Sequence, residues 1–253
     1  MNTNQWIFIS PHLDDVVLSC GGLVWDLTQA GQNVAVWTLM AGLPLHEDYS
    51  LFAQQNHRAW GVSGREAIQR RREEDRAACA VLGAAALHFD WLDAIYRRDP
   101  DSGEPIVNND DQLFNDPPEL GLVDEITVVL KAALPADATL VFPIGLGGHI
   151  DHQAVVQAGD GISQIVYYYA DYPYILKNFD NPGFRKDLWK NIPHPLDQNA
   201  LNAWSQAVLC HASQLNTFWR DAAEARLALR NYLAGGGGRL WRKKSKGIRR
   251  FGD

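Results

Sequence analysis

Short apolar runs alternate with amphipathic stretches along most of the chain. Five short runs are mainly apolar, as expected for buried strands: residues 6–9, 34–40, 86–91, 139–143 and 165–169. Between them, apolar side chains recur at helical spacing over residues 17–30, 65–82, 117–133 and from about 151. Gly31 and Gly83 follow two of these stretches as C-cap signals. Strands that alternate with helices predict βαβ units and a largely parallel sheet in an α/β fold.

Three connections are longer than those that usually join helices and strands, namely residues 42–63, 93–116 and 170–197. We expect them to be functional loops. Two further helices are predicted over residues 197–215 and 219–233, ahead of the glycine run Gly235–Gly238. The pattern therefore predicts a single domain over residues 1–234, followed over residues 235–253 by a Gly-rich hinge and a basic tail.

The charge of the chain is unevenly distributed. Of the net charge of −7 at pH 7, residues 239–253 contribute +6 and the remainder −13. An acidic body would repel the phosphate backbone, so a nucleic-acid-binding domain is not expected. Three cysteines without a CxxC pair are typical of reduced thiols. No secretory signal and no apolar run near the ~20 residues of a membrane helix is visible, so we expect a soluble, cytoplasmic protein without a transmembrane segment.

Two polar segments follow predicted strands and carry the candidate chemistry. The first runs from Ser10 to Asp15 with the sequence SPHLDD, and the second from Gly145 to His152 with the sequence GLGGHIDH. Ligands bind at the carboxyl ends of the strands in an open parallel sheet. We therefore expect the imidazoles and carboxylates of both segments to meet at one site.

Imidazole and carboxylate ligands without a thiolate are what a hydrolytic zinc site needs. His12, Asp15 and one histidine of the second segment supply three such ligands and leave an open position. Asp14 is then a spare carboxylate that can take a proton from water. This pattern predicts metal-assisted hydrolysis.

At these residues the sequence resembles the LmbE-like, or PIG-L, superfamily of zinc-dependent de-N-acetylases, with motifs of the form (A/P)HxDD and HxDH. The similarity extends to LSCGG at 18–22, RREEDRAACAVLG at 71–83, LDAIYR at 92–97 and DYPY at 171–174. These segments are similar to the branch that contains glycopeptide-antibiotic sugar deacetylases. The resemblance covers most of residues 6–176 and implies a Rossmann-like three-layer α/β fold with a mostly parallel sheet.

The resemblance also implies roles for individual residues. It implies that the zinc ligands are His12, Asp15 and His152. It implies that Asp14 is the general base and that His149 stabilises the oxyanion or protonates the leaving amine. Asp151 is then the acid that supports the site histidines. As substrate-binding residues it gives Arg71, Asp93 and Tyr96. Arg71 also has Glu74 at the i,i+3 position, as in a surface ion pair.

One position departs from the family pattern. Some members carry an aromatic residue two positions before the first histidine of HxDH, where this chain has Gly147. A tyrosine contribution would then come from elsewhere, with Tyr96, Tyr169 and Tyr172 as candidates.

The function implied by the resemblance is removal of an N-acetyl or other N-acyl group from an amino sugar or its conjugate, with Zn²⁺ or another divalent metal as cofactor. Two alternatives stay open. A metal-dependent amidase on a non-sugar substrate would keep the same metal residues, and a sugar- or metal-binding protein would use them without turnover. The sequence does not indicate an oligomeric state.

Overall fold

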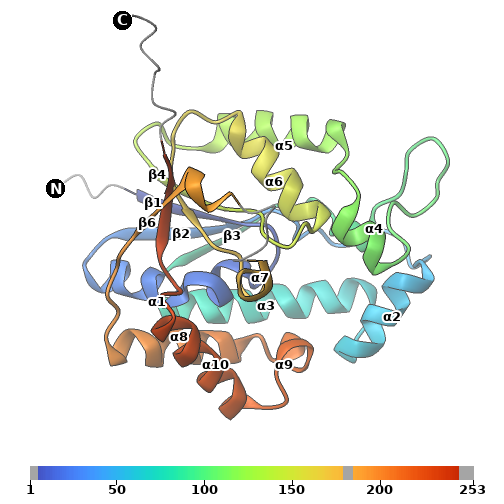
Figure 1. Ribbon diagram of the computed structural model, residues 1–253. Coiled ribbons are helices and arrows are strands. Elements are labelled where there is room, and N and C mark those ends of the chain that lie inside the picture. Colours follow the sequence, from blue (N-terminus) through green and yellow to red (C-terminus); the bar gives the residue numbers. More distant parts are fainter. Residues whose placement is uncertain (1–4, 179–184, 245–253) are drawn as a thin grey trace, which may run out of the picture.

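The computed structural model describes residues 5–178 and 185–244, which include a seven-stranded sheet of order β3-β2-β1-β4-β5-β7-β6 (Figure 1). β1 to β5 form parallel pairs, whereas β7 is antiparallel to both β5 and β6. The strands are β1 (Gln5–Ser10), β2 (Asn33–Thr38), β3 (Ala85–His88), β4 (Thr139–Pro143), β5 (Ile165–Tyr169), β6 (Trp189–Ile192) and β7 (Leu240–Lys243). The predicted α/β fold with a mostly parallel sheet is confirmed.

Helices cover both faces of the sheet. The α-helices are α1 (Asp15–Gln29), α2 (Leu51–Trp60), α3 (Gly64–Leu82), α4 (Asp110–Asn115), α5 (Leu120–Ala133), α6 (Ile150–Asp160), α7 (Tyr174–Asn178), α8 (Gln198–Cys210), α9 (Ala212–Phe218) and α10 (Ala222–Ala234). Two short 3-10 helices are η1 (Ala94–Tyr96) and η2 (Lys186–Leu188). In Figure 1, α5 and α6 lie on one side of the sheet, and α1 and α3 lie on the other with α8, α9 and α10 beyond them.

The alternation of side chains along each strand builds one core on each face. Ile7 and Ile9 of β1 point toward α5 and α6, whereas Phe8 points toward α1, α3 and α8. All three are fully buried. Because both faces of the central strands are covered, these strands carry unbroken apolar runs, which is why the sequence pattern located them.

The segment LSCGG belongs to the packing of α1 against α8. Trp204 of α8 is fully buried and donates its indole N–H to the carbonyl of Val17 at 2.6 Å. A Cβ at Gly21 would lie 2.7 Å from the Trp204 ring, closer than such atoms approach. The glycine therefore lets the indole pack against the helix backbone, which serves the core rather than ligand binding.

Several predictions about the connections need correction. Residues 42–63 contain α2, residues 93–116 contain η1 and α4, and residues 170–197 contain α7, η2 and β6. The two predicted C-terminal helices are three, because His211 separates α8 from α9.

The tail prediction is wrong for residues 240–243. They form β7, which pairs with β5 and β6 inside the sheet, because Leu240 packs into the core and Trp241 packs against it. Residues 245–253 of the predicted basic tail lie outside the described residues. Within the described part of the chain, no helix has the length and apolar character needed to cross a membrane.

Candidate active site

The two motif segments meet where the strand order reverses. β1 and β4 are neighbours, but the chain runs from β1 outward through β2 and β3, and from β4 outward through β5. The loops that follow such a pair of strands diverge to opposite faces and leave a crevice. SPHLDD follows β1 and GLGGHIDH follows β4, so both segments line the crevice as predicted.

Asp15 holds the first segment in a tight turn. Its Oδ2 accepts the backbone N–H of His12 at 2.7 Å, and the same oxygen lies 3.4 Å from His12 Nδ1. It also lies 3.3 Å from His152 Nε2. One carboxylate oxygen therefore contacts imidazole nitrogens from both motif segments.

In each of these two histidines, the other ring nitrogen contacts a second carboxylate. His12 Nε2 lies 2.9 Å from Asp151 Oδ2, and His152 Nδ1 lies 2.8 Å from Asp171 Oδ1. A carboxylate behind a ligating histidine fixes its tautomer and orients the ring toward a metal. His12 Nδ1 and His152 Nε2 are therefore left to face Asp15.

Asp151 and Asp171 are themselves held by other donors. Asp151 accepts the backbone N–H of Ala94 at 3.0 Å and the Arg97 guanidinium at 2.6 Å. Asp171 accepts the backbone N–H groups of Gly145 and Leu146 at 2.8 and 3.0 Å. Both carboxylates are buried, so these contacts replace the water they have lost.

Two of the separations between these ligand atoms are close to those around a tetrahedral metal. With metal–ligand bonds of about 2.0–2.1 Å, the edge of a tetrahedron is about 3.3 Å. The separations of Asp15 Oδ2 from His12 Nδ1 and His152 Nε2, 3.4 and 3.3 Å, match this edge. His12, His149 and His152 each offer one ring nitrogen such that the three nitrogens lie within 4.8 Å of one another. His12, Asp93 and Asp151 also each offer one ligand atom, and these three atoms lie within 4.8 Å of one another. The donor set of imidazoles and carboxylates therefore suits a divalent cation such as Zn²⁺.

The electrostatics of the cluster favour a cation at the same place. Burial alone would raise the pKa of Asp15, but His152 and His12 hold it well below its usual range. Burial would lower the pKa of His152, yet Asp15 and Asp171 raise it to about 9. These carboxylates favour the charged, protonated form of the imidazoles. A dication would be favoured at the same place for the same reason, and it would replace those protons when it binds.

The Asp14 side chain lies beside Arg71. Its Oδ2 lies 3.6 Å from Arg71 Nη2, and both side chains are buried. Burial raises the pKa of Asp14, while Arg71 opposes the rise. The predicted surface pair with Glu74 does not form: Glu74 accepts the backbone N–H and the hydroxyl of Ser213 at 3.0 and 2.6 Å. Arg71 therefore lies inside the site.

His149 is held as a neutral ring at the start of α6. Its Nδ1 accepts the backbone N–H of Asp151 at 3.2 Å and caps the helix. Burial, with the charge of His12 in addition, lowers the pKa of His149 well below its usual value. In a neutral imidazole one nitrogen accepts and the other carries the proton, so Nε2–H is available as a donor.

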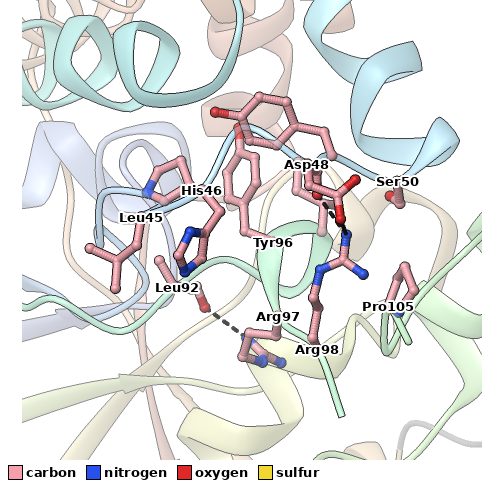
Figure 2. A pocket seen from close by; sticks show the side chains of 12 residues that line it. Leu45, His46, Asp48, Ser50, Leu92, Tyr96, Arg97, Arg98 and Pro105 are labelled. Atoms are coloured by element: carbon pink, nitrogen blue, oxygen red, sulfur yellow. Dashed lines mark hydrogen bonds and ion pairs between the residues drawn. The ribbon is translucent and has the colours of Figure 1, made fainter. Parts of the chain in front are cut away.

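The predicted substrate-binding residues Asp93 and Tyr96 lie at η1. Asp93 Oδ2 is 3.8 Å from His12 Nε2, and its Oδ1 accepts the N–H of Ile95 at 3.2 Å. The Tyr96 hydroxyl lies 2.8 Å from His57 Nε2, and the Tyr96 ring lines a pocket of about 200 Å³. Figure 2 shows this pocket, in which Arg98 reaches Asp48.

The pocket adjoins the cluster through Arg97. This residue lines the pocket and donates to the Leu92 carbonyl at 2.8 Å (Figure 2). It also donates to Asp151 at 2.6 Å. The other lining residues mix apolar and polar side chains, among them Leu45, His46 and Tyr49. A molecule in this pocket would therefore lie next to Arg97, which contacts Asp151, the carboxylate that lies against His12.

The departure at Gly147 has a structural reason. Its φ is +91°, and a Cβ built there would lie 2.5 Å from the ring of Tyr174. The Tyr174 ring centroid lies 5.7 Å from that of His152. Of the three tyrosines considered from sequence, Tyr96 contacts His57, Tyr169 donates its hydroxyl to the Ile9 carbonyl and Tyr172 packs in the core. The aromatic rings beside the site histidines are instead those of Tyr174, next to His152, and Phe114, next to His149.

The structure adds Asp171 and Arg97 to the candidate site. Both lie inside segments that resemble the family, DYPY and LDAIYR, but no role was assigned to them from sequence. Asp171 follows β5 as SPHLDD follows β1, so its place at a strand end was the signal that could have identified it.

Comparison with known proteins links this site to a family. The family described as "PIG-L: GlcNAc-PI de-N-acetylase" matches residues 7–163. A curated relative is 2'-N-acetylparomamine deacetylase of Niallia circulans, which is 28% identical over 208 residues, 74% of this chain and 72% of the relative.

Solved structures with the same fold carry related descriptions. A deacetylase of the teicoplanin biosynthesis pathway matches with a TM-score of 0.73 and 27% identity, covering 96% of this chain and all of that one. The zinc-inhibited form of a teicoplanin deacetylase matches with a TM-score of 0.73 and 25% identity, over 96% of this chain and all of that one.

Proposed function

Because the chain belongs to the PIG-L family of de-N-acetylases, we propose that it hydrolyses the N-acetyl group, or another N-acyl group, of an amino sugar or amino-sugar conjugate. The observation that carries the proposal is the cluster at the ends of β1, β4 and β5. There, Asp15 bridges two imidazoles that each have a carboxylate behind them.

We assign the metal to His12, Asp15 and His152, and the family resemblance favours Zn²⁺. A bound divalent metal would supply Lewis-acid activation of both the water and the acyl carbonyl. Asp151 and Asp171 keep His12 and His152 oriented for binding, since each accepts the proton of the ring nitrogen that faces away from the metal. Because one of the similar structures is a zinc-inhibited form, the metal test must include Co²⁺, Mn²⁺ and Ni²⁺ besides Zn²⁺.

Two side chains of the site then have different roles in the reaction: one transfers a proton and the other donates a hydrogen bond. Asp14 takes the proton of the attacking water, a role suited to a buried carboxyl whose pKa is raised toward the working pH. His149 donates its Nε2–H to the oxygen that becomes negative when the carbonyl carbon turns tetrahedral. The proton on Asp14 passes to the nitrogen as the C–N bond breaks, which releases a carboxylic acid and a free amine.

The pocket beside Arg97 supports a sugar as the acceptor part of the substrate. Tyr96 and Tyr49 offer ring faces for C–H groups, and His46, Asp48 and Arg98 offer polar atoms for hydroxyl or amino groups. Such a mix of aromatic faces and hydrogen-bonding groups suits a carbohydrate. The relative that deacetylates 2'-N-acetylparomamine, an amino-sugar compound by its name, favours this class over a non-sugar amide.

A substrate screen tests the proposal. Metal-replete protein is incubated with N-acetylated amino sugars, 2'-N-acetylparomamine among them, and with non-sugar N-acetyl amides, and released acetate is measured. We expect acetate from the amino sugars and little from the other amides. Turnover of the non-sugar amides alone would support the amidase alternative, and turnover of neither class would support a binding protein.

A further inference from the structure

A buried histidine near the site has no role in the chemistry described so far. His211 lies between α8 and α9 and is 2% exposed. Within residues 5–178 and 185–244, neither of its ring nitrogens has a hydrogen-bond partner. Burying a polar ring without partners costs folding free energy, so a group of this kind usually has a functional reason.

The ring of His211 shares a small hollow with Asp14. Apolar side chains, including Leu18, Leu215 and Phe218, line most of the rest of the hollow, together with the polar side chain of Gln214. The hollow leaves no space for a water molecule to bridge the two polar side chains. The imidazole and the carboxylate can therefore interact across the hollow only by direct contact.

Asp14 also lacks a close partner on its other side. Its ion pair in the described part of the chain is the 3.6 Å contact with Arg71. Arg71 Nε is buried without an acceptor, and its guanidinium carbon lies 5.2 Å from the ring centre of Trp60. Unsatisfied donors thus flank the Asp14 carboxylate from α3 and from the α8–α9 junction.

We propose that His211 is a positioning residue for Asp14: its ring N–H donates to one carboxylate oxygen and leaves the other oxygen free to receive the proton of water. This inference rests on the proposed function, in which Asp14 is the general base. Hydrogen bonds of catalytic groups are often long in a protein without substrate, so we expect this contact to be long in the free protein and to shorten in the complex.

Two variants separate positioning from packing. His211→Phe keeps a ring of similar size in an apolar hollow but removes both nitrogens, and His211→Gln keeps a hydrogen-bond donor. We expect His211→Phe to lower kcat about 10- to 100-fold with KM within about twofold, and His211→Gln to recover a large part of kcat. Because the nitrogens have no partner to lose, His211→Phe should not lower the Tm.

His194→Phe is the matched control. His194 pairs with Asp26 at 2.7 Å, outside the metal cluster, and its loss should leave kcat unchanged. If His211→Phe keeps the wild-type kcat, or if kcat and Tm fall together in both His211 variants, the proposal is wrong.

A second measurement does not depend on turnover. In protein labelled with ¹⁵N-histidine, Asp14→Asn should shift the ring-nitrogen signals of His211 and leave those of His194 in place. Unchanged His211 signals would overturn the proposal even in an active enzyme. Absence of acetate release by the wild type would instead refute the proposed function and leave this spectroscopic result standing.

Discussion

Asp171→Asn is the substitution that best separates the support of a metal ligand from the ligand itself. The carboxylate accepts from His152 Nδ1 at 2.8 Å and from the N–H groups of Gly145 and Leu146 at 2.8 and 3.0 Å. An asparagine has one accepting oxygen, so its NH₂ group must face at least one of these donors. The His152 ring would then lose the partner that fixes its tautomer.

The expected magnitude follows from these three contacts. Loss of a carboxylate behind a metal-binding histidine lowers metal affinity about 10- to 100-fold, which equals about 1.4 to 2.8 kcal/mol. A buried donor left without its acceptor should lower the free energy of unfolding by a further ~1–3 kcal/mol. Metal affinity is measured by competition with a chromophoric chelator, and stability by urea unfolding of the metal-free protein.

Asp26→Asn is the control, because Asp26 also contacts a histidine at 2.7 Å but lies near the surface at His194. It should change metal affinity less than twofold. If Asp171→Asn binds the metal as tightly as the wild type, Asp171 does not hold a metal-binding histidine.

Three further substitutions test other parts of the site. Asp14→Asn should lower kcat about 100- to 10,000-fold while metal content by elemental analysis stays at the wild-type level, and a loss of metal instead would mean that Asp14 is a ligand. Arg97→Met should cost about 3–5 kcal/mol in urea unfolding, because it leaves Asp151 buried without its 2.6 Å ion pair; a cost below ~1 kcal/mol would contradict this. Gly147→Ala should cost about 1–3 kcal/mol, since φ is +91° and the new Cβ meets the ring of Tyr174, and adding Tyr174→Ala should recover part of that loss. Wild-type stability of Gly147→Ala by thermal unfolding would refute that reasoning.

The sequence predicted the part of the fold that is governed by local patterns. Strands buried on both faces are unbroken apolar runs, so β4 and β5 were located with the bounds that the structure has. The strand β7 was missed because it lies in a basic segment, in which Leu240 and Trp241 are the hydrophobic residues that pack with the core. Its place in the sheet depends on contacts with β5 and β6, which local composition does not reveal.

The site was predicted where motif residues follow strands. His12, Asp15 and His152 come together because parallel strands bring their carboxyl ends to one edge. The orientation of Arg71 could not be predicted, since helical spacing offers Glu74 as a partner while the fold turns the guanidinium toward Asp14. The burial of His211 beside Asp14 likewise depends on how α8 and α9 pack, and no motif marks that position.

The central claim is that a metal held by His12, Asp15 and His152 is needed to release acetate from an N-acetylated amino sugar. The direct measurement is acetate release from 2'-N-acetylparomamine by protein stripped with a chelator and then given one equivalent of Zn²⁺, Co²⁺, Mn²⁺ or Ni²⁺. We expect no release by the stripped protein, recovery with at least one metal, and no recovery in His152→Ala. Release at the full rate by the metal-free protein, or recovery in His152→Ala equal to that of the wild type, would contradict the account.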